Sequence, residues 1–219
     1  MIDPFGRTVR GLRVSLTQRC NLNCIYCHHE GEGGISSEMT RDEVLRIIRV
    51  AKSLGVGRVK YTGGEPLLRR DLPEIISGTV AMGMADVAIT TNGTLLKEMA
   101  RDLWHAGLRR LNVSMPSIRP CVYASLTKGA LAEVFAGIKA AKDFGIDIKI
   151  NVVIMKGIND DEVDELVGYA KEIGGSLQLI ELEDLNLDPE FFRRHYFDLT
   201  AVEGRLDTMA DRVEARSDM

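Results

Sequence analysis

The sequence of 219 residues has few aromatic side chains, no excess of positive charge and no long apolar run. Its formal net charge of -4 and its pI near 5.7 argue against a general nucleic-acid-binding protein. Its wholly apolar stretches fall far short of the roughly 20 residues that span a bilayer, and its N-terminus lacks an apolar signal core. We therefore expect a cytoplasmic protein that binds neither membranes nor nucleic acid.

Cysteine is also scarce, but three of the four cysteines lie within eight positions, as Cys20, Cys24 and Cys27 in the pattern C-x3-C-x-Y-C. In a reducing cytoplasm, clustered cysteines are more often metal ligands or redox groups than disulfides. Structural zinc sites and ordinary iron-sulfur clusters use four protein ligands, so three thiolates imply an open coordination position. The alternatives are a zinc site completed by His28 or His29, or three unrelated buried thiols.

The rest of the chain alternates between short apolar segments and amphipathic segments. Thr40 with Glu43, and Thr200 with Glu203, have the spacing of a helix capping box. Regular alternation of strand and helix implies parallel strands with right-handed crossovers, although periodicity does not separate an open sheet from a partial barrel. We expect a single domain over residues 1–219, with strands at 12–16, 58–62, 87–91, 110–114, 147–154 and 177–182, and helices at 41–54, 72–82, 95–106, 130–144, 161–173 and 200–210.

A second motif, Thr62-Gly63-Gly64-Glu65-Pro66, follows the second predicted strand. Its glycines would let a ligand approach the backbone closely, although the same residues could form a plain strand-to-helix turn. Together with a C-x3-C-x-aromatic-C loop at the end of the first strand, this motif resembles the radical S-adenosylmethionine (SAM) superfamily. The resemblance implies an α/β fold, a partial (β/α)6 TIM-type barrel of six parallel strands with outer helices.

The resemblance also implies a set of ligands and the residues that bind them. A 4Fe-4S cluster would be held by Cys20, Cys24 and Cys27, and its free iron would bind SAM. An external electron donor would reduce the cluster, and SAM would then be cleaved to a 5′-deoxyadenosyl radical. Ser114 closes the fourth predicted strand, where a serine is more often a turn former or helix cap. The expected SAM-binding residues are Tyr26, Gly63, Gly64, Glu65 and Ser114.

Longer segments, at 12–20, 62–72, 90–93, 107–114 and 151–160, resemble the GTP 3′,8-cyclase family of molybdenum cofactor biosynthesis. That resemblance implies a homodimeric lyase that converts GTP to 3′,8-cyclo-7,8-dihydro-GTP. The radical takes a hydrogen from the ribose, and the resulting carbon radical attacks C8 of guanine. Family positions that contact GTP carry over to Arg13, Lys60, Thr90 and Lys149. Local cations would hold a triphosphate on an acidic protein, whereas the alternative is that these side chains simply extend to solvent at the barrel rim.

The chain departs from the family pattern in several places. The family has a second three-cysteine cluster in a C-terminal segment, whereas the remaining cysteine here is Cys121, expected to be buried or in a loop. Gln178 replaces an arginine, Glu183 replaces a methionine, and residues 115–117 (Met-Pro-Ser) replace a Leu-Asp pair. The tail at 213–219 is charged and looks unfinished. We expect a cyclase-type enzyme without the second-cluster segment; the alternatives are a radical SAM paralogue acting on another small molecule or peptide, and a non-catalytic iron-sulfur or zinc protein.

Overall fold

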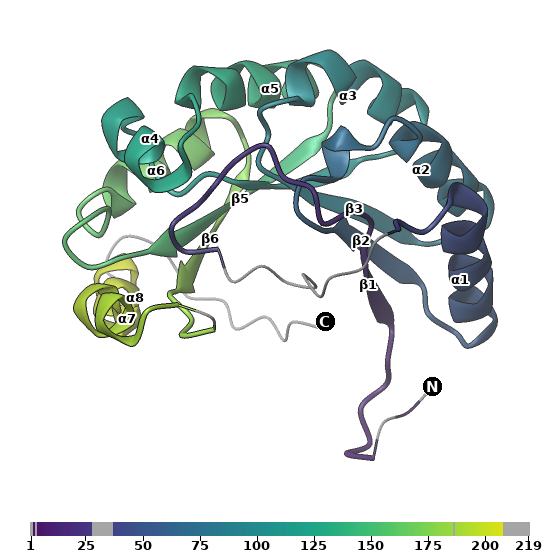
Figure 1. Ribbon diagram of the computed structural model, residues 1–219, viewed down its shortest axis with the longest axis horizontal. Helices are drawn as coiled ribbons and strands as arrows, with labels where there is room; N and C mark the ends of the chain where they lie inside the picture. Colours follow the sequence, from purple (N-terminus) through teal and green to yellow (C-terminus); the bar gives the residue numbers. More distant parts are fainter. Residues whose placement is uncertain (1, 3, 28–36, 186, 208–219) are drawn as a thin grey trace.

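A single parallel sheet forms the centre of the protein. The computed structural model describes residues 2, 4–27, 37–185 and 187–207, shown in Figure 1. Six strands pair in chain order, each parallel to the next. They curve into an open arc, so the predicted partial (β/α)6 barrel is confirmed. The strands are β1 (Gly11–Ser15), β2 (Arg58–Thr62), β3 (Asp86–Thr91), β4 (Arg110–Ser114), β5 (Asp147–Ile154) and β6 (Ser176–Glu181).

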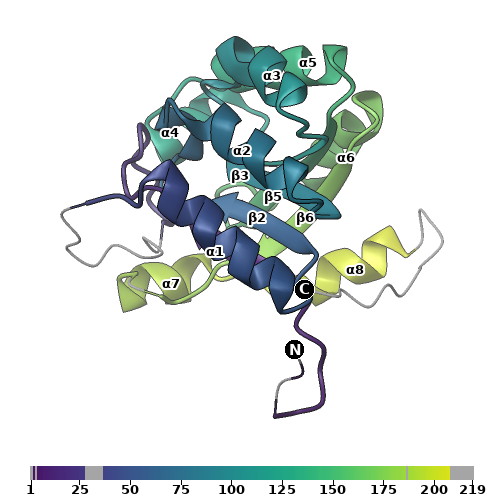
Figure 2. The same ribbon diagram turned by 90° about the vertical axis from the view of Figure 1, so that its right-hand side faces the viewer.

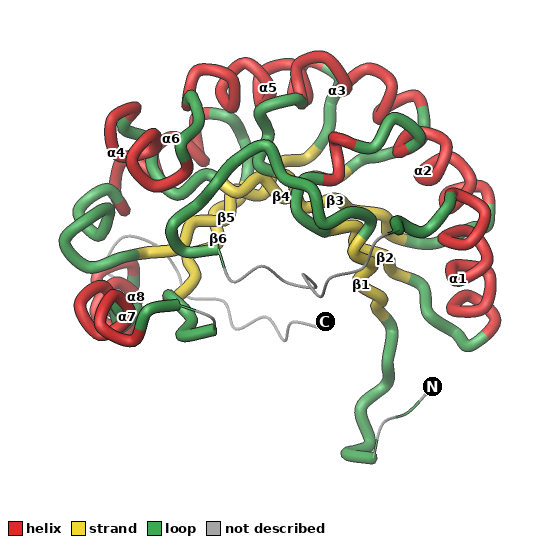
Figure 3. Tube along the Cα trace, in the orientation of Figure 1, coloured by secondary structure: helices red, strands yellow, loops and turns green. Residues whose placement is uncertain are grey.

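Five helices form a layer on the outer, convex face of the sheet (Figures 1 and 3). They are α1 (Arg41–Ser53), α2 (Leu72–Ala81), α3 (Leu96–His105), α5 (Leu131–Asp143) and α6 (Val163–Glu172). Figure 2 shows α1 and α2 lying over the outer side of β2. Three shorter helices, α4 (Pro120–Thr127), α7 (Pro189–His195) and α8 (Thr200–Leu206), and a 3-10 turn at Pro66–Leu68 complete the described structure.

Alternation along the strands decides which side chains meet the helices. In β5, Ile148, Ile150 and Val152 are buried and belong to the main hydrophobic core, whereas Lys149 and Asn151 between them face the inner side of the sheet. Because side chains alternate along a strand, each strand gives an apolar outer face and an inner face that can carry polar groups. The helices cover the outer face, which leaves the inner face available for a ligand.

The local predictions have mixed outcomes. The capping box at Thr40 is confirmed, since its hydroxyl accepts from the Glu43 amide at 3.3 Å and its own amide donates to the Glu43 carboxylate at 2.8 Å. The second capping box is wrong: Thr200 is the first helical residue, and its amide donates to Asp198 at 2.8 Å. Cys121 is exposed and lies in α4, so its expected place in the core or in a loop is also wrong.

Helices α4 and α7 were not predicted, because both are short and lack a clear apolar period. Each begins with proline, Pro120 or Pro189, and proline at the first helical position is the one signal that could have found them. His28, His29 and the tail at 213–219 lie outside the described residues. Over the described ranges, no single helix is long and apolar enough to cross a bilayer; α4 and α5 together reach that length but are bent by 102°.

Two helical glycines allow a matched test of the packing between α3 and α5. A Cβ on Gly137 would lie 2.5 Å from the Gly93 carbonyl oxygen and 2.8 Å from the Cβ of Leu96, whereas a Cβ on Gly168 would meet nothing within 4 Å. We expect Gly137→Ala to lower the free energy of unfolding by about 1–3 kcal/mol through overpacking. Gly168→Ala should raise it by up to about 1 kcal/mol, because alanine favours helix. Urea unfolding checks both; equal effects would contradict this packing.

Candidate functional site

The segment 16–27, which we call the cysteine loop, crosses the end of the barrel. It leaves the carboxyl end of β1 and reaches the far side of the sheet, as the purple segment of Figure 1 shows. There the Asn23 amide donates to the Thr127 carbonyl at 3.1 Å, and the Ile25 amide donates to the Leu126 carbonyl at 2.9 Å, both in α4. The unpredicted helix α4 therefore holds the loop above the carboxyl ends of the strands, where parallel barrels build their sites.

The three clustered thiols are near one another and accessible. Cys20 and Cys27 are exposed, and Cys24 is half-buried. Burial raises the pKa of Cys24 to about 12, and the charges of Cys27 and Cys20 raise it further, while the Tyr26 hydroxyl, hydrogen-bonded to it, opposes the shift. Burial also raises the pKa of Cys20. The protein environment thus favours the neutral thiols of Cys20 and Cys24, and a bound metal would have to drive the deprotonation of these two side chains.

Three cysteine thiols are the donor set of an iron-sulfur cluster with one open position. Among the described residues, no three His, Cys, Asp or Glu side chains form a group that could hold one metal ion. In an iron-sulfur cluster each cysteine binds a different iron, so the sulfurs need not converge on one point. The donor set of Cys20, Cys24 and Cys27 therefore fits a 4Fe-4S cluster with one iron free of protein ligands.

The Gly63-Gly64-Glu65 segment packs directly on the cysteine loop. The Gly64 amide donates to the Thr17 carbonyl and the Glu65 amide donates to the Arg19 carbonyl, both at 2.8 Å. A Cβ on Gly63 or Gly64 would overlap the carbonyl oxygen of Thr17 or Arg19, respectively. The glycines therefore let two loops meet, a reason that the sequence analysis missed. A contact of Gly63 and Gly64 with SAM stays a prediction.

Glu65 lies inside the protein rather than at an open surface. Its side chain is fully buried, and its carboxylate accepts from the Leu67 amide at 2.9 Å, the Thr91 hydroxyl at 2.7 Å and the Asn92 amide at 2.7 Å. Burial raises the pKa of Glu65 to about 6, against the opposing effect of these donors. These contacts give Glu65 a positioning role, and its expected contact with SAM stays a prediction.

Asn92 connects this buried carboxylate to the first cysteine. Its side-chain amide donates to the Asn21 side-chain oxygen at 2.9 Å and lies 4.0 Å from the Cys20 sulfur. The Asn21 amide in turn donates to the Thr94 hydroxyl at 2.9 Å. The Thr-Asn-Gly sequence at the end of the third predicted strand drew attention to Asn92. Its hydrogen bonds to the cysteine loop could not be predicted from that sequence.

Four cations gather on the inner face of the sheet. The pKa of Lys60 is lowered, first by burial and then by the positive charges of Arg13, Lys149 and Arg110, while Asp86 opposes the shift. The structure thus brings together three of the predicted GTP-binding residues. Arg110 was missed as a site residue, although its position in the strand places it on the same face.

The remaining polar groups of the inner face are partly satisfied. Arg110 and Asp86 form an ion pair at 2.5 Å, and the Lys149 ammonium lies 3.4 Å from the Gln178 side-chain oxygen. Thr90 is half-buried, and its hydroxyl accepts from the Asn112 side chain at 3.4 Å. Ser114 pairs with Asn151 across the sheet, and the buried Asn151 side-chain oxygen has no hydrogen-bond partner among the residues that the structure describes. An orphaned acceptor beside a cluster of cations indicates a face built for a polar ligand.

Comparison with known proteins agrees with this geometry. The Radical SAM superfamily profile matches residues 14–170, which include the cysteine loop and the glycine motif. The chain therefore belongs to the radical SAM superfamily.

Its curated relatives place it in one family within that superfamily. It is 42% identical over 220 residues to the probable GTP 3′,8-cyclase of Methanothermobacter thermautotrophicus, covering 99% of this chain and 72% of the relative. It is 44% identical to the probable GTP 3′,8-cyclase of Methanocella arvoryzae, covering 99% of this chain and 69% of the relative. The chain thus belongs to the same family as these proteins.

Solved structures support the fold. Streptococcus suis SuiB bound to S-adenosylmethionine has a TM-score of 0.79 and is 19% identical, covering 93% of this chain and 47% of that one. The chain thus spans about half the length of this structure. At 19% identity, this structural similarity concerns the fold of the barrel and does not indicate the substrate.

The buried carboxyl of Glu65 gives a pH-dependent prediction for the metal-free protein. Its folded pKa of about 6 lies above the ordinary value of 4.5, so its contribution to stability is fully present below about pH 4.5 and is lost as the pH rises through about 6. Relative to Glu65→Gln, the wild-type free energy of unfolding should fall by about 2 kcal/mol across that window. Urea titrations between about pH 4.5 and pH 7.5 measure the difference, and parallel curves for the two proteins would contradict it.

Proposed function

We propose that this chain is a radical SAM enzyme of the GTP 3′,8-cyclase type that acts in molybdenum cofactor biosynthesis. The observation that carries the substrate assignment is the group of four cations on the inner face, below a loop whose thiols fit an open iron-sulfur cluster. A nucleoside triphosphate needs such a concentration of positive charge, which the acidic chain as a whole does not supply. The family relatives are the second support.

The proposal gives each part of the site a role. Cys20, Cys24 and Cys27 hold the 4Fe-4S cluster, and SAM lies against Tyr26, Gly63, Gly64, Glu65 and Ser114. When bound, the reduced cluster supplies the electron that cleaves SAM to methionine and a 5′-deoxyadenosyl radical. The protein contributes binding and orientation: Arg13, Lys60, Thr90 and Lys149 fix GTP, and the walls of the barrel limit access of water. Arg110 adds a further cation, held in place by Asp86.

We extend this proposal to the domain organisation, the cellular location, the electron donor and the oligomeric state. We infer that residues 1–219 act as one radical SAM core domain in the cytoplasm. An external donor reduces the cluster, no nucleic acid or membrane takes part, and the active form is a homodimer. Anaerobic size-exclusion chromatography with light scattering tests the dimer, since a monomer at micromolar concentration would contradict it.

The activity is tested by anaerobic reconstitution with iron and sulfide, followed by reduction with dithionite in the presence of SAM. We expect 5′-deoxyadenosine to form and its yield to rise when GTP is added. Absence of 5′-deoxyadenosine under every condition would overturn the enzyme assignment. Formation that is indifferent to GTP would overturn the cyclase assignment and favour a paralogue with another substrate.

Lys60 offers a sharper test of the substrate site. Replacing it with methionine keeps the length of the side chain but removes one charge from the group of cations, so GTP should bind about tenfold or more weakly, as for a lost charge-assisted hydrogen bond. The matched control is Lys139→Met, because Lys139 is exposed on α5 and pairs with Asp143 at 2.7 Å. Equilibrium dialysis with GTP compares the three proteins. Equal affinities for wild type and Lys60→Met would remove Lys60 from the site.

A further inference from the structure

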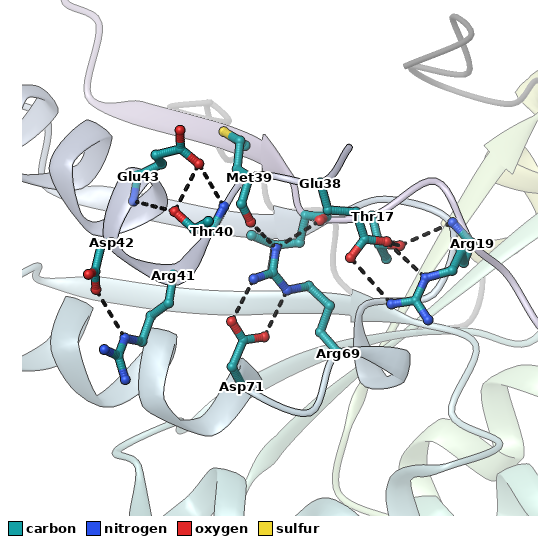
Figure 4. A network of polar contacts seen from close by, with 11 residues as sticks. Thr17, Arg19, Glu38, Met39, Thr40, Arg41, Asp42, Glu43, Arg69 and Asp71 are labelled. Atoms are coloured by element: carbon teal, nitrogen blue, oxygen red, sulfur yellow. Dashed lines mark hydrogen bonds and ion pairs between the residues drawn. The ribbon is translucent and has the colours of Figure 1, made fainter. Parts of the chain in front are cut away.

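Side chains join the start of the cysteine loop to the segment just before α1 (Figure 4). Leu16 to Arg19 follow β1 and Glu38 to Thr40 precede α1, and these are the two ends of the connection between β1 and α1. Glu38 joins the two ends: its carboxylate accepts from the Thr17 hydroxyl, and from the Arg19 guanidinium at 2.8 Å (Nε) and 3.3 Å (Nη2). Hydrogen bonds from Arg19 and Thr17 and the charge of Arg19 lower the pKa of Glu38, so the pair is ionised at neutral pH.

A second side chain, Arg69, bridges the same two ends from below. Its Nη1 donates to the Leu16 carbonyl at 3.1 Å and to the Met39 carbonyl at 2.8 Å. Its other nitrogens bind Asp71, from Nε at 2.9 Å and from Nη2 at 2.6 Å. Arg69 is only 5% exposed, and a guanidinium is buried at such a position only when its donors are satisfied. The five donors of arginine in a rigid fork suit this bridge better than the single ammonium of lysine.

These contacts act on the residues immediately before the first cysteine. On one side, Thr17 and Arg19 are bound through their carbonyls to the amides of Gly64 and Glu65. On the other side, the same two residues are bound through their side chains to Glu38. Arg19 precedes Cys20 in the sequence, so loss of Glu38 would leave the backbone before Cys20 held from one side only.

We propose that Glu38 and Arg69 are positioning residues that fix the base of the cysteine loop and thereby set how firmly, and in what geometry, the three thiols hold their cluster. This inference rests on the cluster assigned under the proposed function. Neither residue touches the cluster; both act through Leu16, Thr17 and Arg19. Partners one step away from metal ligands commonly change metal affinity tenfold or more when they are removed.

The test uses the full chain, reconstituted anaerobically, as wild type and as Glu38→Gln, Arg69→Met, Arg69→Lys and Asp42→Asn. Asp42→Asn is the matched control, because it removes an exposed ion pair of 3.2 Å with Arg41 in the same region without touching either end of the loop. Glu38 is at the surface, so Glu38→Gln gives an answer even where Arg69→Met fails to fold.

The readouts are the rate of iron release to a chelator and the electron paramagnetic resonance spectrum of the reduced protein with and without SAM. We expect Glu38→Gln and Arg69→Met to release iron about tenfold faster than wild type and to change the spectrum, and Arg69→Lys to recover part of the loss. Asp42→Asn should match wild type. The inference is overturned if Glu38→Gln and Arg69→Lys both match Asp42→Asn. A wild-type protein that binds no cluster would overturn the proposed function and this inference with it.

Discussion

The contact between two backbone segments is the constraint on which the site depends. The amides of Gly64 and Glu65 donate to the carbonyls of Thr17 and Arg19. The two segments are so close that neither Gly63 nor Gly64 could carry a side chain. Two hydrogen bonds extend the pairing of β1 and β2 beyond the ends of the strands. The cysteine loop therefore begins from a rigid edge of the sheet rather than from a free turn. A loop that starts rigidly can present thiols in one geometry, which is what cluster binding requires.

Burying Glu65 behind that contact has a cost and a function. A carboxylate in the interior is unfavourable, as its raised pKa shows, and three donors offset the cost only in part. In return, one side chain binds the loop after β2 and the loop after β3 together. Asn92 then extends the network to Asn21 and to the sulfur of Cys20. The unfavourable burial of Glu65 thus fixes the relative positions of the loops that follow β1, β2 and β3.

Strand and helix periods are local, so the sequence predicted the parallel α/β alternation, whereas the partial barrel was predicted from the family resemblance. It predicted the three thiols because their spacing is contiguous. It did not predict the positioning contacts of Glu38 and Arg69. The hydrogen bonds from Arg69 to the carbonyls of Leu16 and Met39, for example, leave no pattern in side-chain type. Arg110 was missed for a related reason. One cation in a strand is unremarkable until the sheet curves and brings it close to Lys60.

That curvature explains how an acidic protein can present a cationic interior. Neighbouring strands turn the inner face into a concave surface, so cations that are far apart in the sequence act on one another there, although the whole chain has a net negative charge. Asp86 opposes the cations that act on Lys60, and it is already paired with Arg110. Burial lowers the pKa of Lys60, and repulsion from the neighbouring cations lowers it further, so the charged form of Lys60 is unfavourable on this face. An anionic ligand would relieve that repulsion. The positive charges that lower the stability of the free protein would then provide affinity for a triphosphate.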